Sequence, residues 1–146
     1  MNVTIHEDKE VDEIKVAITC PVIDSKVTRI VANLNTFDMK LTGFIDHQTV
    51  IIDPNDVYYL ETVDRKTFIY TQSSVFESPL KLYERKDRLA GTEFVQISKQ
   101  MIINFDKVIA LEPYFNARLL LTLANKESVI VSRQYAPTIK KKLGLR

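Results

Sequence analysis

The sequence predicts a mainly β protein with two or three short helices. Its 146 residues are enough for one ordinary domain and too few for two full ones. Hydrophobic residues make up 45% and charged residues 27%, which is typical of a globular chain and not of a disordered one. From residue 40 onward, short runs rich in β-branched and aromatic residues follow one another at close spacing. We therefore expect most of the chain to form short strands.

The first element that the pattern predicts is a strand over residues 11–20. Here Ile14, Val16 and Ile18 alternate with polar residues, as in a half-buried strand. Pro21 would end it.

A helix is expected next, through about Asn33. Asp24 and Ser25 are both suitable N-caps. The apolar residues of the segment recur at helical spacing, and they are Val27, Ile30, Val31 and Leu34.

Four strand-like runs follow, over residues 39–44, 48–53, 56–63 and 66–71. Pro54 and Asn55 predict a turn between the second and third runs. Residues 63–66 predict the tip of a hairpin between the third and fourth runs.

A second helix is expected from Ser78 to about Ala90. Ser78 is a good N-cap, and Pro79 at the first helical position loses no hydrogen bond there. Gly91 is placed to end the helix.

The C-terminal part predicts further closely spaced strands and a terminal helical turn. In the run 118–123, the side chains of Leu119, Leu121 and Leu123 would face one way. Pro137 would start the last helical turn. The strand-like runs are residues 93–97, 101–105, 107–112, 118–123 and 128–132.

Basic residues gather in the second half of the chain. Residues 1–39 contain four basic and seven acidic residues, and residues 40–78 contain three and six. Residues 79–146 contain thirteen and six, a net charge of +7. Concentrated positive charge is what binding to a polyanion requires, although lysines that only solvate a surface would give the same count.

The sequence contains no motif for catalysis or metal binding. Neither His6 nor His47 lies at a metal-ligand spacing with the other or with Cys20. Cys20 is better interpreted as a buried structural residue than as a nucleophile, and three dispersed glycines cannot form a phosphate-binding loop. We expect no enzyme activity, no metal, no cofactor and no small-molecule substrate.

The sequence favours a cytoplasmic location. No apolar run approaches the roughly 20 residues that a membrane-spanning helix requires. The acidic N-terminus lacks the apolar region of a secretory signal. A single cysteine allows no intrachain disulfide, which fits a reducing compartment.

Two segments of the second half carry a family resemblance. Residues 94–113, FVQISKQMIINFDKVIALEP, and residues 128–144, SVIVSRQYAPTIKKKLG, strongly resemble the LytTR DNA-binding domain. The family pairs a strand motif ending in asparagine, here residues 101–104, with a Ser-Arg-x-Tyr step, here residues 132–135. Residues 56–71 look like its first strand pair. The resemblance covers about residues 44–144.

The resemblance implies an elongated sandwich of small β-sheets that binds double-stranded DNA. Such domains insert loops from strand ends into two successive major grooves, and three places in this chain correspond to those loops. Arginine can grip one guanine with two hydrogen bonds, whereas lysine is a point donor suited to guanine or phosphate. The implied contact residues are Arg65, Lys66 and Thr67 in the first loop, Ser98, Lys99 and Gln100 in the second, and Arg133 and Gln134 in the third.

Several nearby residues have simpler structural explanations. Asn104 is better interpreted as a turn residue than as a base reader. Tyr135 and Phe94 are better interpreted as core aromatics, because duplex DNA offers no unstacked bases. Residues 140–142, three lysines, would form a solvated helix end or meet phosphates.

The resemblance also implies a mode of control. Residues 1–40 are too short for the receiver domain of LytTR response regulators, so the chain resembles stand-alone members, some of which are held inactive by a membrane protein. We expect residues 1–40 to serve dimerisation or regulation, and a homodimer to bind paired promoter repeats. The competing interpretation is a β-rich protein-interaction module that uses exposed strand edges and does not bind DNA. The charge of +7 favours DNA.

Overall fold

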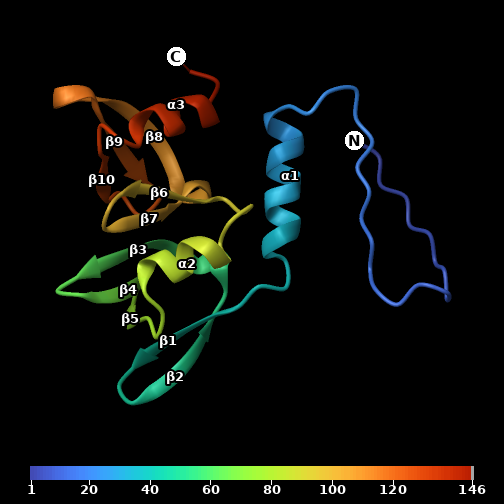
Figure 1. The fold of residues 1–146 in the computed structure, drawn as a ribbon, viewed down its shortest axis with the longest axis horizontal. Helices are drawn as coiled ribbons and strands as arrows, with labels where there is room; N and C mark the ends of the chain where they lie inside the picture. The colour runs from blue at the N-terminus through green and yellow to red at the C-terminus, as the bar shows by residue number, and fades with distance from the viewer. Residues whose placement is uncertain (146) are drawn as a thin grey trace.

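The computed structural model describes residues 1–145, and strands dominate the part that follows α1 (Figure 1). The strands form a seven-stranded antiparallel sheet in the order β2-β1-β5-β4-β3-β7-β6 and a three-stranded sheet in the order β10-β9-β8. This confirms the expected mainly β fold of small packed sheets. The helices are α1 (Ser25–Thr36), α2 (Leu82–Arg88) and α3 (Ala136–Lys142), with single turns η1 (Pro54–Asp56), η2 (Phe105–Lys107) and η3 (Phe115–Ala117), and the strands are β1 (Leu41–Ile45), β2 (Gln48–Ile52), β3 (Val57–Val63), β4 (Lys66–Thr71), β5 (Val75–Glu77), β6 (Phe94–Ser98), β7 (Met101–Asn104), β8 (Val108–Tyr114), β9 (Arg118–Leu123) and β10 (Ser128–Val131).

The large sheet is buried on both faces where β3 and β7 pair. Leu60 lies opposite Ile102, and both belong to a core cluster that α2 covers with Leu82. The next residue, Ile103, belongs to a second cluster on the other face. Because side chains alternate along a strand, β7 contributes to two cores at once.

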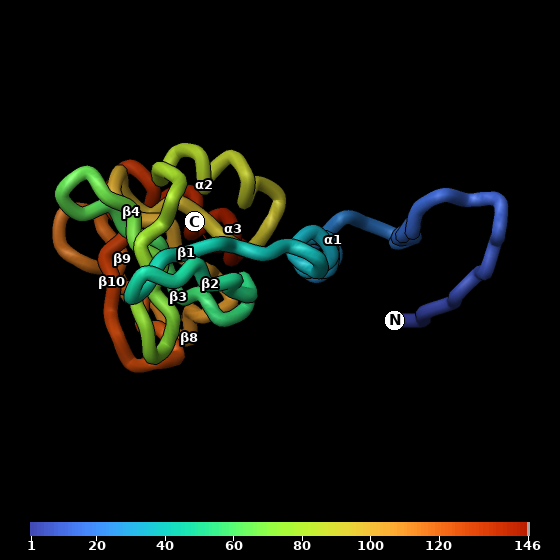
Figure 2. The backbone as a smooth tube through the Cα atoms, turned by 90° about the horizontal axis from the view of Figure 1, so that it is seen from below, coloured from blue at the N-terminus to red at the C-terminus, as the bar shows by residue number. Residues whose placement is uncertain are grey.

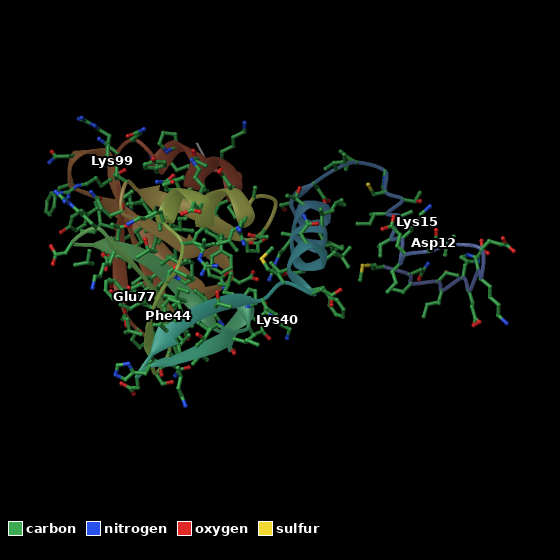
Figure 3. The ribbon with its side chains drawn as sticks, turned by 60° about the horizontal axis from the view of Figure 1, so that its bottom comes forward. Asp12, Lys15, Lys40, Phe44, Glu77 and Lys99 are labelled. Atoms are coloured by element: carbon green, nitrogen blue, oxygen red, sulfur yellow. The ribbon has the colours of Figure 1, made fainter. Side chains whose placement is uncertain are left out.

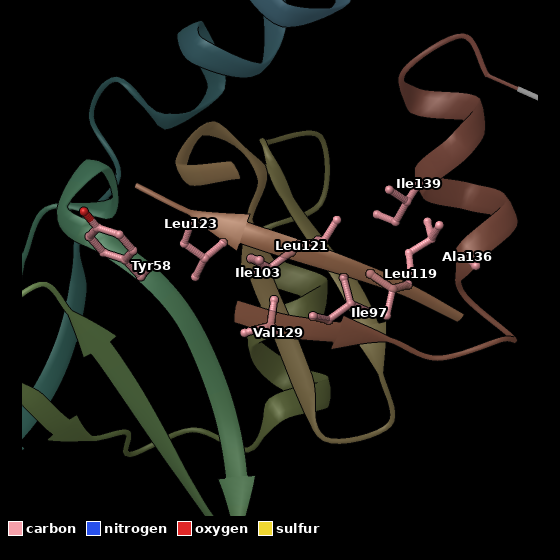
Figure 4. Close-up of a cluster of buried hydrophobic side chains, with 10 residues drawn as sticks. Tyr58, Ile97, Ile103, Leu119, Leu121, Leu123, Val129, Ala136 and Ile139 are labelled. Carbon is pink, nitrogen blue, oxygen red and sulfur yellow. The ribbon is translucent and has the colours of Figure 1, made fainter. Parts of the chain in front are cut away.

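The second core lies between the large sheet, the small sheet and α3 (Figure 4). Leu119, Leu121 and Leu123 project from β9 into it and are at most 3% exposed, as their alternation predicted. Ile139 of α3 is fully buried at the end of the cluster. Burial of each such side chain stabilises the fold by roughly 1.5–3 kcal/mol.

The predicted hairpin tip at residues 63–66 is confirmed. Val63 pairs with Lys66, so only two residues form the loop. Asp64 and Arg65 have φ values of 52° and 67°, the left-handed pair that a type I′ turn requires. This turn follows the twist of β3 and β4 and therefore holds Arg65 at a defined position.

The start of the second helix differs from the prediction. α2 begins at Leu82 after Lys81, not at Ser78 and Pro79. The Ser78 hydroxyl instead forms a local turn, because it accepts from Leu80 N at 3.1 Å and donates to Leu80 O at 2.8 Å. Gly91 has a φ of 78° and lies just beyond the helix, as expected.

The predicted strand over residues 11–20 was wrong. Residues 1–24 form no strand or helix, and Ile14 is 93% exposed. Nothing in the described chain lies beside them to complete a sheet, and this segment extends away from the β domain (Figure 2). Cys20, expected to be buried, is half-exposed.

The predicted helix α1 is present and ends three residues later than expected. Asp24 is its N-cap, and its carboxylate accepts from Val27 N at 3.0 Å. Within residues 1–145, no helix is both long enough and apolar enough to cross a membrane.

Candidate nucleic-acid interface

Backbone hydrogen bonds bring the three predicted loops together. Thr62 N, next to the β3–β4 tip, donates to Gln100 O in the β6–β7 turn at 2.8 Å. Ser132 N, next to the β10–α3 loop, donates to Ile97 O at the end of β6 at 2.8 Å. The chain segments that carry Arg65, Lys99 and Arg133 are therefore neighbours, although nearly 70 residues separate the first from the last.

Two of these segments border a groove of about 550 Å³. Arg65 and Lys99 line it, and so do Lys81 and Lys86 of the α2 region. Four cations around one groove attract a polyanion, because each adds to the local potential. The uncharged lining residues are Thr62, Thr67, Leu82, Tyr83 and Gln96.

Sequence reasoning missed Lys81 and Lys86. Both belong to the basic C-terminal half, but nothing in the spacing of their segment showed that α2 lies against the β3–β4 tip. The Lys81 ammonium donates to Arg65 O at 3.1 Å and so ties the helix to the turn. Lys81 N in turn donates to the Glu84 carboxylate at 3.0 Å, which satisfies one free backbone donor at the start of the helix.

Within the first predicted loop, only Arg65 is exposed without an ionic partner in the described chain. The Lys66 ammonium lies 3.8 Å from the Glu77 carboxylate, so part of its charge is compensated. Thr67 is only 3% exposed, and its hydroxyl lies 3.4 Å from that of Thr62. Thr67 thus forms the floor of the groove, where its hydroxyl supports the turn.

In the second loop, Ser98 shapes the turn and Lys99 projects from it. The half-buried Ser98 hydroxyl accepts from Gln100 N at 3.3 Å. The side chains of Lys99 and Gln100 are exposed. Figure 3 shows Lys99 at the far end of the domain from the N-terminal segment that carries Asp12 and Lys15.

The third loop is fixed at its base and free at its side chains. Tyr135 N and Ala136 N both donate to Ser132 O, at 3.0 and 2.9 Å. Arg133 and Gln134 lie between these anchors and are exposed. Within residues 1–145 neither Arg133 nor Lys99 forms an ion pair, so both guanidinium and ammonium groups are available to a ligand.

Arg85 supports the interface from the interior of the domain. It is 3% exposed, its Nε donates to Ser78 Oγ at 3.0 Å, and its Nη2 donates to Thr42 O at 2.8 Å. Burial lowers its pKa from the ordinary value, and the nearby Arg88 lowers it further. Arg85 therefore fastens α2 to β1, and with it the groove lysines.

The C-terminal lysines do not act alike. Lys142 lies 3.6 Å from the buried Glu93 carboxylate and 5.2 Å from the centre of the Phe105 ring, so it fastens α3 to the domain. Lys141 is exposed. Only part of this basic run is therefore open to solvent.

The simpler explanations for Asn104, Tyr135 and Phe94 are confirmed. Asn104 is 3% exposed, donates to Val57 O at 2.9 Å and accepts from Asp106 N at 3.1 Å. Tyr135 and Phe94 are half-buried against the two core clusters. Among residues 1–145, no group of three His, Cys, Asp or Glu side chains could hold a metal ion.

A β-rich scaffold with adjacent basic turns has the features of a nucleic-acid-binding module. Comparison with known families agrees with this class. The family model described as the LytTr DNA-binding domain matches residues 47–144, and the chain belongs to this family. The family and fold expected from the motifs are thereby confirmed.

The relatives differ in how much of their own length this chain matches. The sensory transduction protein LytT of Enterococcus faecalis is 30% identical over 95 residues, which are 65% of this chain and 39% of that protein. The transcriptional regulatory protein YpdB of Escherichia coli K12 is 29% identical over 93 residues, 62% of this chain and 38% of that protein. The matched region thus spans about two fifths of these relatives.

Two further matches cover most of the length of the matched protein. An uncharacterized HTH-type transcriptional regulator of Staphylococcus aureus is 29% identical over 132 residues, 88% of each chain. The solved LytTr DNA-binding domain of a putative methyl-accepting/DNA response regulator from Bacillus cereus has a TM-score of 0.69 at 26% identity. The match covers 73% of this chain and 97% of that one.

Proposed function

We propose that this chain is a transcription regulator that binds specific double-stranded DNA through the edge formed by its three loops. The observation that carries this proposal is the adjacency of the Arg65, Lys99 and Arg133 segments. Cations that lie next to one another can contact the same short stretch of a duplex. The backbone hydrogen bonds from Thr62 and Ser132 hold the three segments together and leave the side chains of Arg65, Lys99 and Arg133 free.

The geometry suggests a division of tasks among the cations. Arg133 projects from an anchored loop and can grip guanine O6 and N7. Lys99 suits a guanine or a phosphate, and Arg65 extends the same edge. Lys81 and Lys86 border the groove beside them and suit the phosphates of a backbone that crosses it. The uncharged Ser98, Gln100 and Gln134 suit hydrogen bonds to base edges or phosphates.

Other features of the proposed function rest on the sequence patterns and the family resemblance, and they stay predictions. They are a cytoplasmic location, absence of enzyme activity and binding to paired promoter repeats as a homodimer. If two domains lie on one face of the duplex, the repeats should be separated by multiples of about 10–10.5 base pairs. An inhibitory membrane protein is a further predicted partner.

The test begins with selection of binding sites from a random duplex library, followed by gel shifts at several salt concentrations. The duplex upstream of the chain's own gene is the first natural target to examine. We expect an enriched motif and an affinity that falls steeply with salt. Lys86→Ala and Lys99→Ala, each made as a single replacement, should weaken binding to every duplex. Lys40→Ala removes the same single charge away from Lys99 (Figure 3) and should not weaken it. No enrichment, or an equal loss after Lys40→Ala, would count against the proposal.

A further inference from the structure

The N-terminal segment exposes large apolar residues at a higher density than the rest of the described chain. Within residues 1–145, twelve of the 22 strongly exposed large apolar residues lie in the first 37 positions, a quarter of the chain. Ile5 and Ile14 are 89% and 93% exposed, and Phe37, just after α1, is 82% exposed. A concentration of exposed apolar side chains of this kind is typical of an interaction site.

The total accessible surface area is also larger than that of a compact monomer. The chain has a mass of 16.8 kDa, and a compact monomer of that mass exposes about 7,700 Å². The structure exposes 10719 Å². The excess is about 3,000 Å². If each of two copies covered half of its excess, they would bury about 3,000 Å² together, which is within the range of obligate homodimers.

The backbone of this segment also lacks partners. Over residues 1–23, the only backbone–backbone hydrogen bond within the described chain is the one from Val11 N to Asp8 O, at 3.4 Å. The turn around Asp8 separates two extended legs, residues 2–7 and 14–20 (Figure 1). Extended chain with unpaired N–H and C=O groups is a template for pairing with another strand.

The second leg has the side-chain pattern of a strand that covers a core. If residues 14–20 pair as a strand, Ile14, Val16 and Ile18 lie on one face, and Lys15, Ala17 and Thr19 lie on the other. Large apolar side chains thus alternate with polar or small ones, although no sheet in the described chain covers them. Pairing with a strand outside this chain would bury the large apolar side chains of this leg.

The helix α1 carries the segment away from the domain. Its C-terminal end is attached, because the Asn35 side chain donates to Gly91 O at 2.8 Å and Ala32 is buried. Its flank remains open, since Val31 and Leu34 are 41% and 42% exposed. We call residues 1–36 the arm.

We propose that the arm pairs with the arm of a second copy of this chain, forming an intertwined antiparallel dimer that leaves both DNA-binding edges free. Self-pairing suits the second leg, because residues 14–20 carry only one charge, that of Lys15, and centring the pair on Val16 places Lys15 opposite Ala17 of the other copy. The acidic residues of the arm are concentrated between positions 7 and 13, which disfavours nucleic acid or an anionic membrane as the occupant. Figure 3 shows the arm on the opposite side of the domain from Lys99.

Sedimentation of the full chain without DNA tests this proposal independently of the proposed function. We expect a dimer at micromolar concentration. The double replacement Ile14→Asp and Val16→Asp places four buried charges in a symmetric interface, so the dimer dissociation constant should rise at least about 100-fold. Two controls keep the dimer: Ala17→Asp, on the other face of the same leg, and Ile109→Asp, at a residue of β8 that is 56% exposed.

A DNA titration completes the experiment. The double variant should bind a duplex with one site as the parent does, because the arm contributes nothing to either core cluster. On a duplex with two sites, the double variant should lose the increase in affinity that the parent gains from cooperative binding. A parent chain that stays monomeric at about 100 μM, a double variant that stays dimeric, or a monomer produced equally by Ile109→Asp would each overturn the proposal.

Discussion

Replacement of Arg133 by Ala should separate sequence recognition from general attraction to DNA. The Arg133 side chain is exposed and forms no ion pair within residues 1–145, so its removal should change the free energy of unfolding by no more than about 0.5 kcal/mol. On the cognate duplex, loss of two hydrogen bonds to one guanine should cost about 1–3 kcal/mol, which raises the dissociation constant roughly 5- to 150-fold. Preference should relax at one base position only, because the neighbouring loops remain anchored.

Lys141→Ala provides the matched control. Lys141 is exposed in α3, close in sequence to Arg133, and its replacement removes the same unit of charge. If Lys141 meets a phosphate, its replacement should weaken cognate and random duplexes alike and reduce the salt slope by about one.

Fluorescence anisotropy titrations of parent and both variants against cognate duplex, random duplex and single-base variants, at four salt concentrations, give these quantities. Equal loss on cognate and random DNA after Arg133→Ala would show that Arg133 only clamps the backbone. Unchanged affinity on both would place the recognition surface elsewhere.

Three further replacements probe the support of the interface. Arg85→Ala should lower the free energy of unfolding by about 2–4 kcal/mol, because the Thr42 carbonyl of β1 loses its Arg85 donor and Ser78 Oγ loses one of its two donors. The adjacent Lys86→Ala should leave stability unchanged in urea denaturation and weaken only DNA binding. Comparable stability of the two variants would contradict the assigned roles. Asn104→Ala should cost about 1–3 kcal/mol in the same assay, because the buried Val57 carbonyl and the part-buried Asp106 N–H lose their partner. A loss below about 0.5 kcal/mol would argue against this role. Burial and the hydrogen bond to Glu127 raise the pKa of Tyr59 above its ordinary value of 10.0. The stability from this shift is therefore present below pH 10 and is lost as the pH rises further. Tyr59→Phe should lose less unfolding free energy than the parent between about pH 9 and pH 11, and an unaltered pH profile would refute the assignment.

Residue patterns alone predicted most of the local structure. The hairpin tip at Arg65 and the inward face of Leu119, Leu121 and Leu123 were predictable because turn chemistry and side-chain alternation act between near neighbours in sequence. The start of α2 was not, since Ser78 had two local uses for its hydroxyl. Its bond with the buried Arg85 favours the turn at Leu80 over the helix cap.

For the candidate site, the sequence by itself determined the family and the three loops, because both follow from short contiguous motifs. Only the tertiary structure decided which side chains of those loops reach solvent: Arg65 does, whereas Thr67 forms the floor of the groove. It also added Lys81 and Lys86, which belong to no motif and come to the groove through packing of α2 against the sheet. The misplaced strand over residues 11–20 has the same cause: alternation shows that a segment is suited to pairing, but whether a partner strand lies beside it depends on contacts that no local pattern contains.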